Sequence, residues 1–173
     1  MTNFKEDLAR VKAFIFDIDG VLSLQTISLN SFGVPNRTVN LRDGYALQLA
    51  VKKGYFVGVI SGSSSKEYQR RLKLLGVKDI YLNSRSKSDH FDDFLKKHNL
   101  NSNDVLFMGD DIPDYKVMKQ AGIAVWPADA DNEIKQVASY ISDKKGGEGC
   151  VRDVIEQVLR LHNNWMDSDA FTW

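Results

Sequence analysis

The sequence predicts an α/β fold, in which a Rossmann-like parallel sheet is flanked by helices. Short apolar runs alternate with amphipathic segments along the chain, and the runs contain few polar residues. Such runs are typical of strands that are buried on both faces of a parallel sheet. The amphipathic segments between them have the pattern of the helices that cover such a sheet. The length of 173 residues fits a single domain, 1–173.

Five apolar runs are the predicted strands, and the residues that follow them end each strand. The runs are Val11–Phe16, Tyr55–Ile60, Asp79–Leu82, Val105–Met108 and Ile123–Trp126. Asp17 follows the first run, Ser61-Gly62 the second, Gly109-Asp110 the fourth and Pro127 the fifth. Polar side chains are therefore expected at the carboxyl ends of several strands.

Helical periodicity predicts a helix after most of these strands. The predicted helices begin near Asp43, Ser65, Ser88, Pro113, Asp131 and Cys150. Asp43 is a residue type that caps a helix, and Pro113 suits a first turn. Gly54, Gly76 and Gly122 lie where the first, second and fourth of these helices would end.

The segment Val21–Leu41 interrupts the alternation, because it is too polar and irregular for a helix. We predict a projecting β-hairpin here, with strands at Gln25–Asn30 and Arg37–Leu41 around the turn 31–35. After the last helix, the tail Asn163–Trp173 carries three aromatic residues. These aromatic side chains favour docking of the tail on a protein surface, although a disordered chain end is the alternative.

The composition excludes several classes of protein. Lys+Arg and Asp+Glu number 23 each, so the formal net charge is zero and a nucleic-acid partner is not expected. With one cysteine, Cys150, the chain has neither an internal disulfide nor a cysteine-based zinc site. The first ten residues do not resemble a signal peptide, and no apolar run approaches the roughly 18 residues of a membrane span. We therefore expect a cytoplasmic protein.

Two carboxylates, Asp17 and Asp19, follow the first predicted strand. Residues i and i+2 of an extended chain point the same way, roughly 6.5–7 Å apart, so these carboxylates would repel each other. A hard cation such as Mg²⁺ removes that repulsion, and Asp110 at a neighbouring strand end would be a further ligand. An isolated Asp-x-Asp-Gly would equally well begin a turn.

Three further groups lie near the ends of the other strands. Ser61-Gly62 offers a hydroxyl and a flexible backbone N–H to an anion, and Lys87 follows the third strand. Asp110, Asp111 and Asp114 lie beside a predicted helix start, where capping explains one of them better than all three. Each group alone has an ordinary structural explanation, but the carboxyl ends of parallel strands are where function gathers in such sheets.

The order D-x-D-G, S-G, K, G-D-D-x-x-D resembles the haloacid dehalogenase superfamily of phosphohydrolases, over a stretch from Val11 to about Leu161. The resemblance implies that Asp17 is a nucleophile that takes the phosphoryl group, and that Asp19 is the general acid and base. It implies phosphate binding by Ser61, Gly62 and Lys87, a Mg²⁺ site of Asp17, Asp19 and Asp110, and support of that site by Asp111 and Asp114.

Three stretches, Thr38–Ala46, Gly109–Asp114 and Gly146–Asp153, are similar to the 3-deoxy-D-manno-octulosonate (KDO) 8-phosphate phosphatases. This resemblance implies release of phosphate from KDO 8-phosphate in lipopolysaccharide biosynthesis. It also implies a capless core, a homotetramer with the hairpins packed at its centre, and a C-terminal tail that can approach a neighbouring subunit's site.

The chain departs from many members of that group at one position. They carry Gly-Arg after the Ser or Thr of the second motif, where this chain has Ser61-Gly62-Ser63. Arg42, Arg70 and Arg85 remain open as replacements. Arg37 and Arg42 are further candidates for pairing with a substrate carboxylate, because planar Arg pairs well with carboxylates.

Three alternatives to this function remain. The nearest is a phosphatase of a 9-phosphorylated nonulosonic (sialic-type) acid. Another is a non-enzymatic phospho-receiver, but a receiver's phosphoacceptor follows the third strand, where this chain has no acidic residue before Asp89. The third is a non-catalytic scaffold, which would need none of the candidate site residues.

Overall fold

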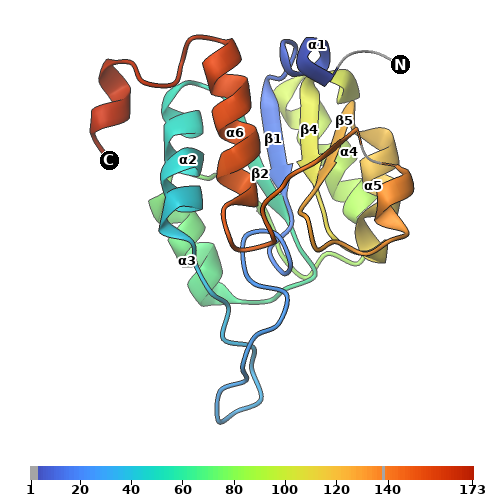
Figure 1. Cartoon of the computed structure of the whole chain (residues 1–173). Helices are drawn as coiled ribbons and strands as arrows, with labels where there is room; N and C mark the ends of the chain where they lie inside the picture. Colours follow the sequence, from blue (N-terminus) through green and yellow to red (C-terminus); the bar gives the residue numbers. More distant parts are fainter. Residues whose placement is uncertain (1–3, 138) are drawn as a thin grey trace.

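The structure, a computed structural model, describes residues 4–137 and 139–173. Its centre is a parallel sheet with the strand order β3-β2-β1-β4-β5-β6 (Figure 1). The strands are β1 Ala13–Phe16, β2 Phe56–Ile60, β3 Asp79–Tyr81, β4 Val105–Met108, β5 Ile123–Trp126 and β6 Tyr140–Ile141. The α/β prediction is confirmed, and all five predicted strands are present; the short β6 has no counterpart among them.

The helices lie on both faces of this sheet. They are α1 Phe4–Leu8, α2 Leu41–Lys52, α3 Lys66–Leu74, α4 Lys87–His98, α5 Tyr115–Gln120 and α6 Cys150–Leu161. Short 3₁₀ turns cover Ser102–Asp104, Ile112–Asp114, Ile134–Gln136 and Ser168–Phe171. The helix predicted after Asp131 is only the single turn Ile134–Gln136, so that prediction was wrong.

Alternating side chains of the strands supply two apolar cores. Phe14 and Phe16 of β1 belong to the core beneath α2, α3 and α6, while Ile15 between them faces the core beneath α4 and α5. All four residues of β1 are buried, as are those of β4 and β5. Burial on both faces explains why polar and apolar residues do not alternate in the sequence of these strands.

The strand order creates a switch point at the centre of the sheet. From β1 the chain builds outward through β2 to β3, and it then returns to β4 on the other side of β1. The loops after β1 and β4 therefore diverge from neighbouring strands. This is the place where open α/β sheets bind their ligands.

Two helix starts differ from the prediction. The cap of α2 is Asn40, whose side-chain oxygen accepts hydrogen bonds from the N–H groups of Arg42 (2.9 Å) and Asp43 (3.2 Å). Asp43 is instead buried, and its carboxylate accepts a hydrogen bond from the N–H of Arg152 in the first turn of α6 (2.7 Å). The cap of α4 is Ser86 rather than Ser88, so Lys87 is the first residue of that helix.

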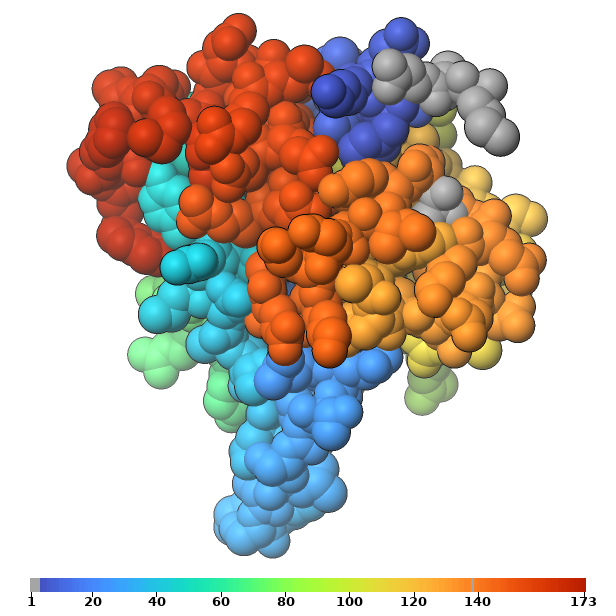
Figure 2. Space-filling model, in the orientation of Figure 1, coloured from blue at the N-terminus to red at the C-terminus, as the bar shows by residue number. Residues whose placement is uncertain are grey.

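The segment between β1 and α2 projects from the body of the protein, as Figures 1 and 2 show, but it is not the predicted pair of strands. Within these described residues, one antiparallel bridge joins Leu29 and Pro35. Hydrogen bonds from Asn30 N–H to Val34 O and from Asn36 N–H to Ser28 O hold the tip (both 2.9 Å). A two-stranded ribbon without a core is marginal in water, and Pro35 has no N–H to extend the ladder.

The C-terminal tail docks on its own chain, beside α2 (Figure 1). Trp165 is 6% exposed and packs edge-on against Tyr45 of α2. Lys52 donates hydrogen bonds to the Thr172 carbonyl oxygen (2.9 Å) and hydroxyl (3.1 Å), and Lys53 pairs with acidic residues of the tail. This surface lies along the helix, away from the carboxyl ends of the strands.

Among the described residues, no helix is both long and apolar enough to span a membrane.

Candidate active site

A pocket of about 520 Å³ opens at the carboxyl ends of the central strands. The loops after β1, β2, β3 and β4 all contribute side chains to it. Every residue predicted for the phosphate and metal sites lines it: Asp17, Asp19, Ser61, Gly62, Lys87, Asp110, Asp111 and Asp114. Residues separated by nearly a hundred positions in the sequence therefore meet in one place.

Three buried carboxylates form the acidic part of this pocket. Asp17, Asp110 and Asp114 are 7%, 5% and 0% exposed, and each offers an oxygen within 4.8 Å of the others. Burial raises the pKa of Asp110 to about 8, and repulsion from Asp114 and Asp17 adds to the effect. Burial and the Asp17 charge likewise raise the pKa of Asp114 to about 7. A divalent cation would remove this repulsion, so the donor set fits a hard metal ion such as Mg²⁺.

Lys87 provides the positive charge of the pocket floor. Its Nζ lies 2.6 Å from Asp17 Oδ2 and 2.6 Å from Asp114 Oδ1. Burial alone would lower the pKa of Lys87, but the two carboxylates outweigh burial and raise it. The ammonium group therefore stays charged beside the Asp17 carboxylate.

Two glycines let the carboxylates approach one another. Gly20 has a φ of +76°, and a Cβ there would lie 1.9 Å from Asp110 Oδ2. A Cβ on Gly109 would lie 2.4 Å from Asp114 Cγ. Each glycine of D-x-D-G and G-D-D-x-x-D thus creates space that a carboxylate fills.

The structure places Asp19 differently from the other acids. Its carboxylate, 45% exposed, forms a two-pronged ion pair with Arg37, at 2.7 Å to Nε and 2.8 Å to one terminal nitrogen. Within the described chain, the three converging carboxylates include Asp114 and not Asp19. The sequence signal for Asp114 is weak, because only the turn that starts at Asp111 brings a residue four positions after Asp110 back to it.

Ser61 and Asp111 have backbone roles as well. Ser61 is 1% exposed, and its hydroxyl accepts a hydrogen bond from the N–H of Ser63 (3.2 Å). Gly62 beside it is exposed, and a Cβ there would have a nearest contact of 4.0 Å, so the space next to this glycine is open. Asp111 is exposed and caps the turn Ile112–Asp114, accepting a hydrogen bond from Ile112 N–H (2.7 Å).

Comparison with known proteins agrees with these observations. Residues 76–155 match the haloacid dehalogenase-like hydrolase family. The 3-deoxy-D-manno-octulosonate 8-phosphate phosphatase KdsC of Salmonella typhi is 33% identical over 149 residues, which cover 86% of this chain and 79% of that protein. The chain belongs to the haloacid dehalogenase-like hydrolases, in the family of the KdsC phosphatases.

Solved structures of similar proteins share the fold. A 3-deoxy-D-manno-octulosonate 8-phosphate phosphatase from Moraxella catarrhalis, in complex with a magnesium ion, a phosphate ion and KDO, has a TM-score of 0.90 and 32% identity. It covers 99% of this chain and 97% of its own. The corresponding phosphatase from Yersinia pestis has a TM-score of 0.88 and 29% identity, covering 92% and 86% of the two chains. As predicted for this hydrolase, the elements formed by residues 4–137 and 139–173 include no large cap domain.

One supporting segment was not recognised as part of the site from the sequence. Gly146 and Gly147 of this hydrolase lie directly against the loop that follows Asp19. A Cβ on Gly146 would lie 1.9 Å from the Gly20 carbonyl oxygen, and Gly147 N–H donates to Val21 O (2.7 Å). The two glycines therefore allow close contact between the two backbone segments, and they fix the loop that carries Asp17 and Asp19.

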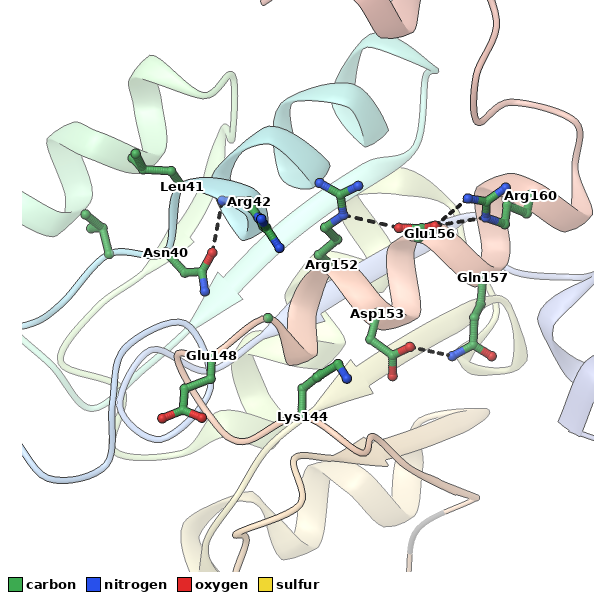
Figure 3. A pocket seen from close by; sticks show the side chains of 12 residues that line it. Asn40, Leu41, Arg42, Lys144, Glu148, Arg152, Asp153, Glu156, Gln157 and Arg160 are labelled. Carbon is green, nitrogen blue, oxygen red and sulfur yellow. Dashed lines mark hydrogen bonds and ion pairs between the residues drawn. The ribbon is translucent and has the colours of Figure 1, made fainter.

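Arg42 lies outside the pocket, in a separate groove of about 1050 Å³ between the start of α2 and α6 (Figure 3). Charged side chains of α6 pair with one another there. Glu156 accepts ion pairs from Arg152 Nε (3.2 Å) and from a terminal nitrogen of Arg160 (2.6 Å). The structure therefore does not bring Arg42 to the candidate active site.

Proposed function

We propose that this chain is a Mg²⁺-dependent phosphatase that hydrolyses 3-deoxy-D-manno-octulosonate 8-phosphate to KDO and phosphate, in the cytoplasm, as a step of lipopolysaccharide biosynthesis. The observation that carries the proposal is the meeting of Asp17 with Lys87 and the acidic pair Asp110 and Asp114. Its support is the similarity, along nearly the whole chain, to a phosphatase structure that holds magnesium, phosphate and KDO.

Asp17 is the nucleophile in this proposal. One of its carboxylate oxygens accepts a hydrogen bond from the N–H of Ile18 (2.6 Å), and the other lies on Lys87. The side chain is therefore held in one orientation at the pocket floor. Its attack on phosphorus forms an aspartyl phosphate and breaks the bond to the sugar oxygen, which divides a difficult hydrolysis into two easier steps.

Lys87, Ser61 and Gly62 bind the transferring phosphoryl group. Charge on its oxygens is the main demand of phosphoryl transfer, and a buried ammonium group answers it without reorganisation. Mg²⁺, held by Asp17, Asp110 and Asp114, would supply further charge neutralisation for the same oxygens.

Asp19 is the general acid and base. It protonates the leaving sugar oxygen, and it then takes a proton from the water that attacks the aspartyl phosphate. In the free protein Arg37 binds this carboxylate with two hydrogen bonds at the edge of the pocket. This ion pair must open before Asp19 carries the proton that it gives to the leaving oxygen. Arg37 is thereby engaged with the enzyme's own acid.

The same proposal includes a homotetramer. The projecting segment carries exposed apolar side chains, with Phe32 88%, Leu29 62% and Val34 48% exposed. Contact between copies of this segment would cover them and shield an open, capless pocket from water. Light scattering tests this point: the expected mass is four times 19.6 kDa, and a mass equal to one chain would refute the tetramer.

Phosphate release in the presence of Mg²⁺ tests the function. KDO 8-phosphate, a 9-phosphorylated nonulosonic acid and simple sugar phosphates are compared by kcat/KM. A strong preference for KDO 8-phosphate is expected. A preference for the nine-carbon acid would keep the chemistry and replace the substrate, while stable phosphorylation without turnover would identify a receiver.

A further inference from the structure

More acidic than basic side chains line the candidate active site. Five carboxylates line the pocket: Asp17, Asp19, Asp110, Asp111 and Asp114. Among the described residues that line it, the cations are Lys87 and Arg85. Lys87 pairs with two carboxylates at the floor, and the proposed function assigns its remaining donor to the phosphate. Among the described residues that line the pocket, Arg85 is therefore the cation that remains for a second anionic group on a substrate.

Arg85 is available for such a contact. Its side chain is exposed at the rim of the pocket, and it makes no hydrogen bond or ion pair with the described part of the chain. The guanidinium group of Arg37, in contrast, already forms an ion pair with Asp19. A guanidinium group without a partner, beside a cluster of acids, is ready to pair with an incoming carboxylate in two-pronged geometry.

The backbone that carries Arg85 is fixed, although the side chain is not engaged. Ser84 N–H donates to Ser61 O (3.0 Å), and Asn83 N–H donates to Ser63 O (2.9 Å), so the loops after β2 and β3 lie side by side. Directly after Arg85, Ser86 caps α4 and Lys87 begins it. A single residue, Ser86, therefore separates the buried cation at the floor from the exposed cation at the rim.

This arrangement matches a molecule with two anionic ends. In a sugar-acid phosphate such as KDO 8-phosphate, the phosphate and the carboxylate lie at opposite ends of the carbon chain. With the phosphate at Lys87, the far end of the substrate projects towards the rim. Of the arginines left open by the sequence, Arg42 lines the α2–α6 groove, and Arg70 is an exposed residue of α3 that lies outside the pocket.

We propose that Arg85 binds the carboxylate of the substrate and makes this phosphatase selective for phosphorylated sugar acids. The proposal rests on the proposed function, and it assigns to the loop after β3 a contact that the loop after β2, with Ser63 in place of a cation, does not offer. Arg85 is a substrate-binding residue in this assignment and takes no part in bond making or breaking.

The test compares Arg85→Ala, Arg85→Lys and the control Arg70→Ala on two substrates, KDO 8-phosphate and glucose 6-phosphate, which lacks a carboxylate. Arg85→Ala is expected to lower kcat/KM for the sugar acid by about 10- to 100-fold, mainly through KM, because an ion pair to a charged group is lost. Its kcat/KM for glucose 6-phosphate should stay within about twofold of wild type. Arg85→Lys should recover part of the loss, and Arg70→Ala should change neither value.

Inhibition by free KDO gives a second readout without the phosphate. Its inhibition constant should rise in Arg85→Ala and stay constant in Arg70→Ala. If wild type prefers KDO 8-phosphate and Arg85→Ala keeps that preference, or loses both activities equally, the role of Arg85 is refuted alone. If wild type shows no preference for the sugar acid, the proposed function fails first, and the role of Arg85 fails with it.

Discussion

Two hollows of this protein differ in how their charged side chains are arranged. The α2–α6 groove, of about 1050 Å³, is the larger, and its charges lie mostly on one helix, where Glu156 pairs with Arg152 and Arg160. The pocket at the strand ends is half as large, about 520 Å³, and its charged side chains come from three separate segments, those that follow β1, β3 and β4. In the groove, oppositely charged neighbours on one helix form ion pairs. In the pocket, by contrast, the fold holds three carboxylates close together.

The comparison indicates that crowded acidic side chains, and not the volume of a cavity, identify the candidate active site. Helix neighbours at i and i+4 pair at little cost, so such pairs are common on surfaces without function. Asp110 and Asp114 are instead held with pKa values of about 8 and 7 by a fold that keeps them buried and close. An arrangement that costs stability in the free protein is expected where a ligand or metal relieves it.

The largest expected effect comes from removing the proposed nucleophile. Asp17→Asn keeps the size of the side chain and its hydrogen-bonding oxygen, but it cannot form an aspartyl phosphate. Turnover of KDO 8-phosphate should fall by at least about 10⁴-fold, as for nucleophiles of other enzymes. The measurement is phosphate release with a check of folding by circular dichroism.

The matched control is Glu148→Gln, the same acid-to-amide change at an exposed carboxylate of the α2–α6 groove. It should leave turnover within about twofold of wild type. Normal turnover of Asp17→Asn would show that another group attacks phosphorus, and the assignment of the pocket floor would then be wrong.

Lys87→Gln should have the next largest effect. The variant removes the charge that neutralises the phosphoryl group, so kcat should fall by about 10²- to 10³-fold. It also leaves Asp17 and Asp114 without their shared partner, and Mg²⁺ should therefore become more important for the stability of the fold. Single-turnover kinetics at saturating substrate separates the loss in kcat from weaker binding, and an unchanged kcat would contradict the role of Lys87.

The location of the pocket could be predicted from the sequence, because its side chains lie at the carboxyl ends of the predicted strands. Unbroken apolar runs identified the strands, and parallel strands bring their carboxyl ends to one edge, so Asp17, Ser61, Lys87 and Asp110 were expected together. The partner of each side chain could not be predicted in the same way. The pairing of Asp19 with Arg37 depends on how the projecting segment folds back, and an 18-residue separation in sequence carries no signal of it.

Local turns account for the remaining differences between prediction and structure. Asn40 and Asp43 are both good capping residues. The packing of α2 on α6 decides that Asn40 caps α2, while Asp43 accepts a hydrogen bond from the first turn of α6. The choice between Arg42, Arg70 and Arg85 likewise depends on which loop borders the pocket. Such choices are made by tertiary contacts, which residue types and spacing do not encode.

Removal of the metal should expose the cost of the acidic cluster. Because burial raises the pKa of Asp110 to about 8 and of Asp114 to about 7, the folded protein binds more protons than the unfolded chain between about pH 4 and 8. The stability of the metal-free protein should therefore fall progressively as the pH rises from about 4 to 8, and it should level off above that range.

Thermal unfolding in EDTA and in excess Mg²⁺, followed from about pH 5 to 8.5, measures this effect. Mg²⁺ binds the ionised carboxylates, so it should stabilise the protein most at high pH and flatten the decline. Equal stabilisation by Mg²⁺ at every pH would mean that the metal does not bind this cluster.

The smallest effect is expected in the α2–α6 groove, and it is the sharpest test of the contrast. Glu156→Gln removes both ion pairs of that carboxylate, but all three side chains are partly exposed and their attraction is screened by water and salt. The free energy of unfolding should fall by about 0.5 kcal/mol or less, and the loss should vanish at about 1 M salt. Turnover should not change, because these charges are satisfied within their own helix. A loss of turnover of more than about tenfold, with the fold intact, would make the groove part of the working site. Local ion pairing would then no longer distinguish a groove without function from the active site.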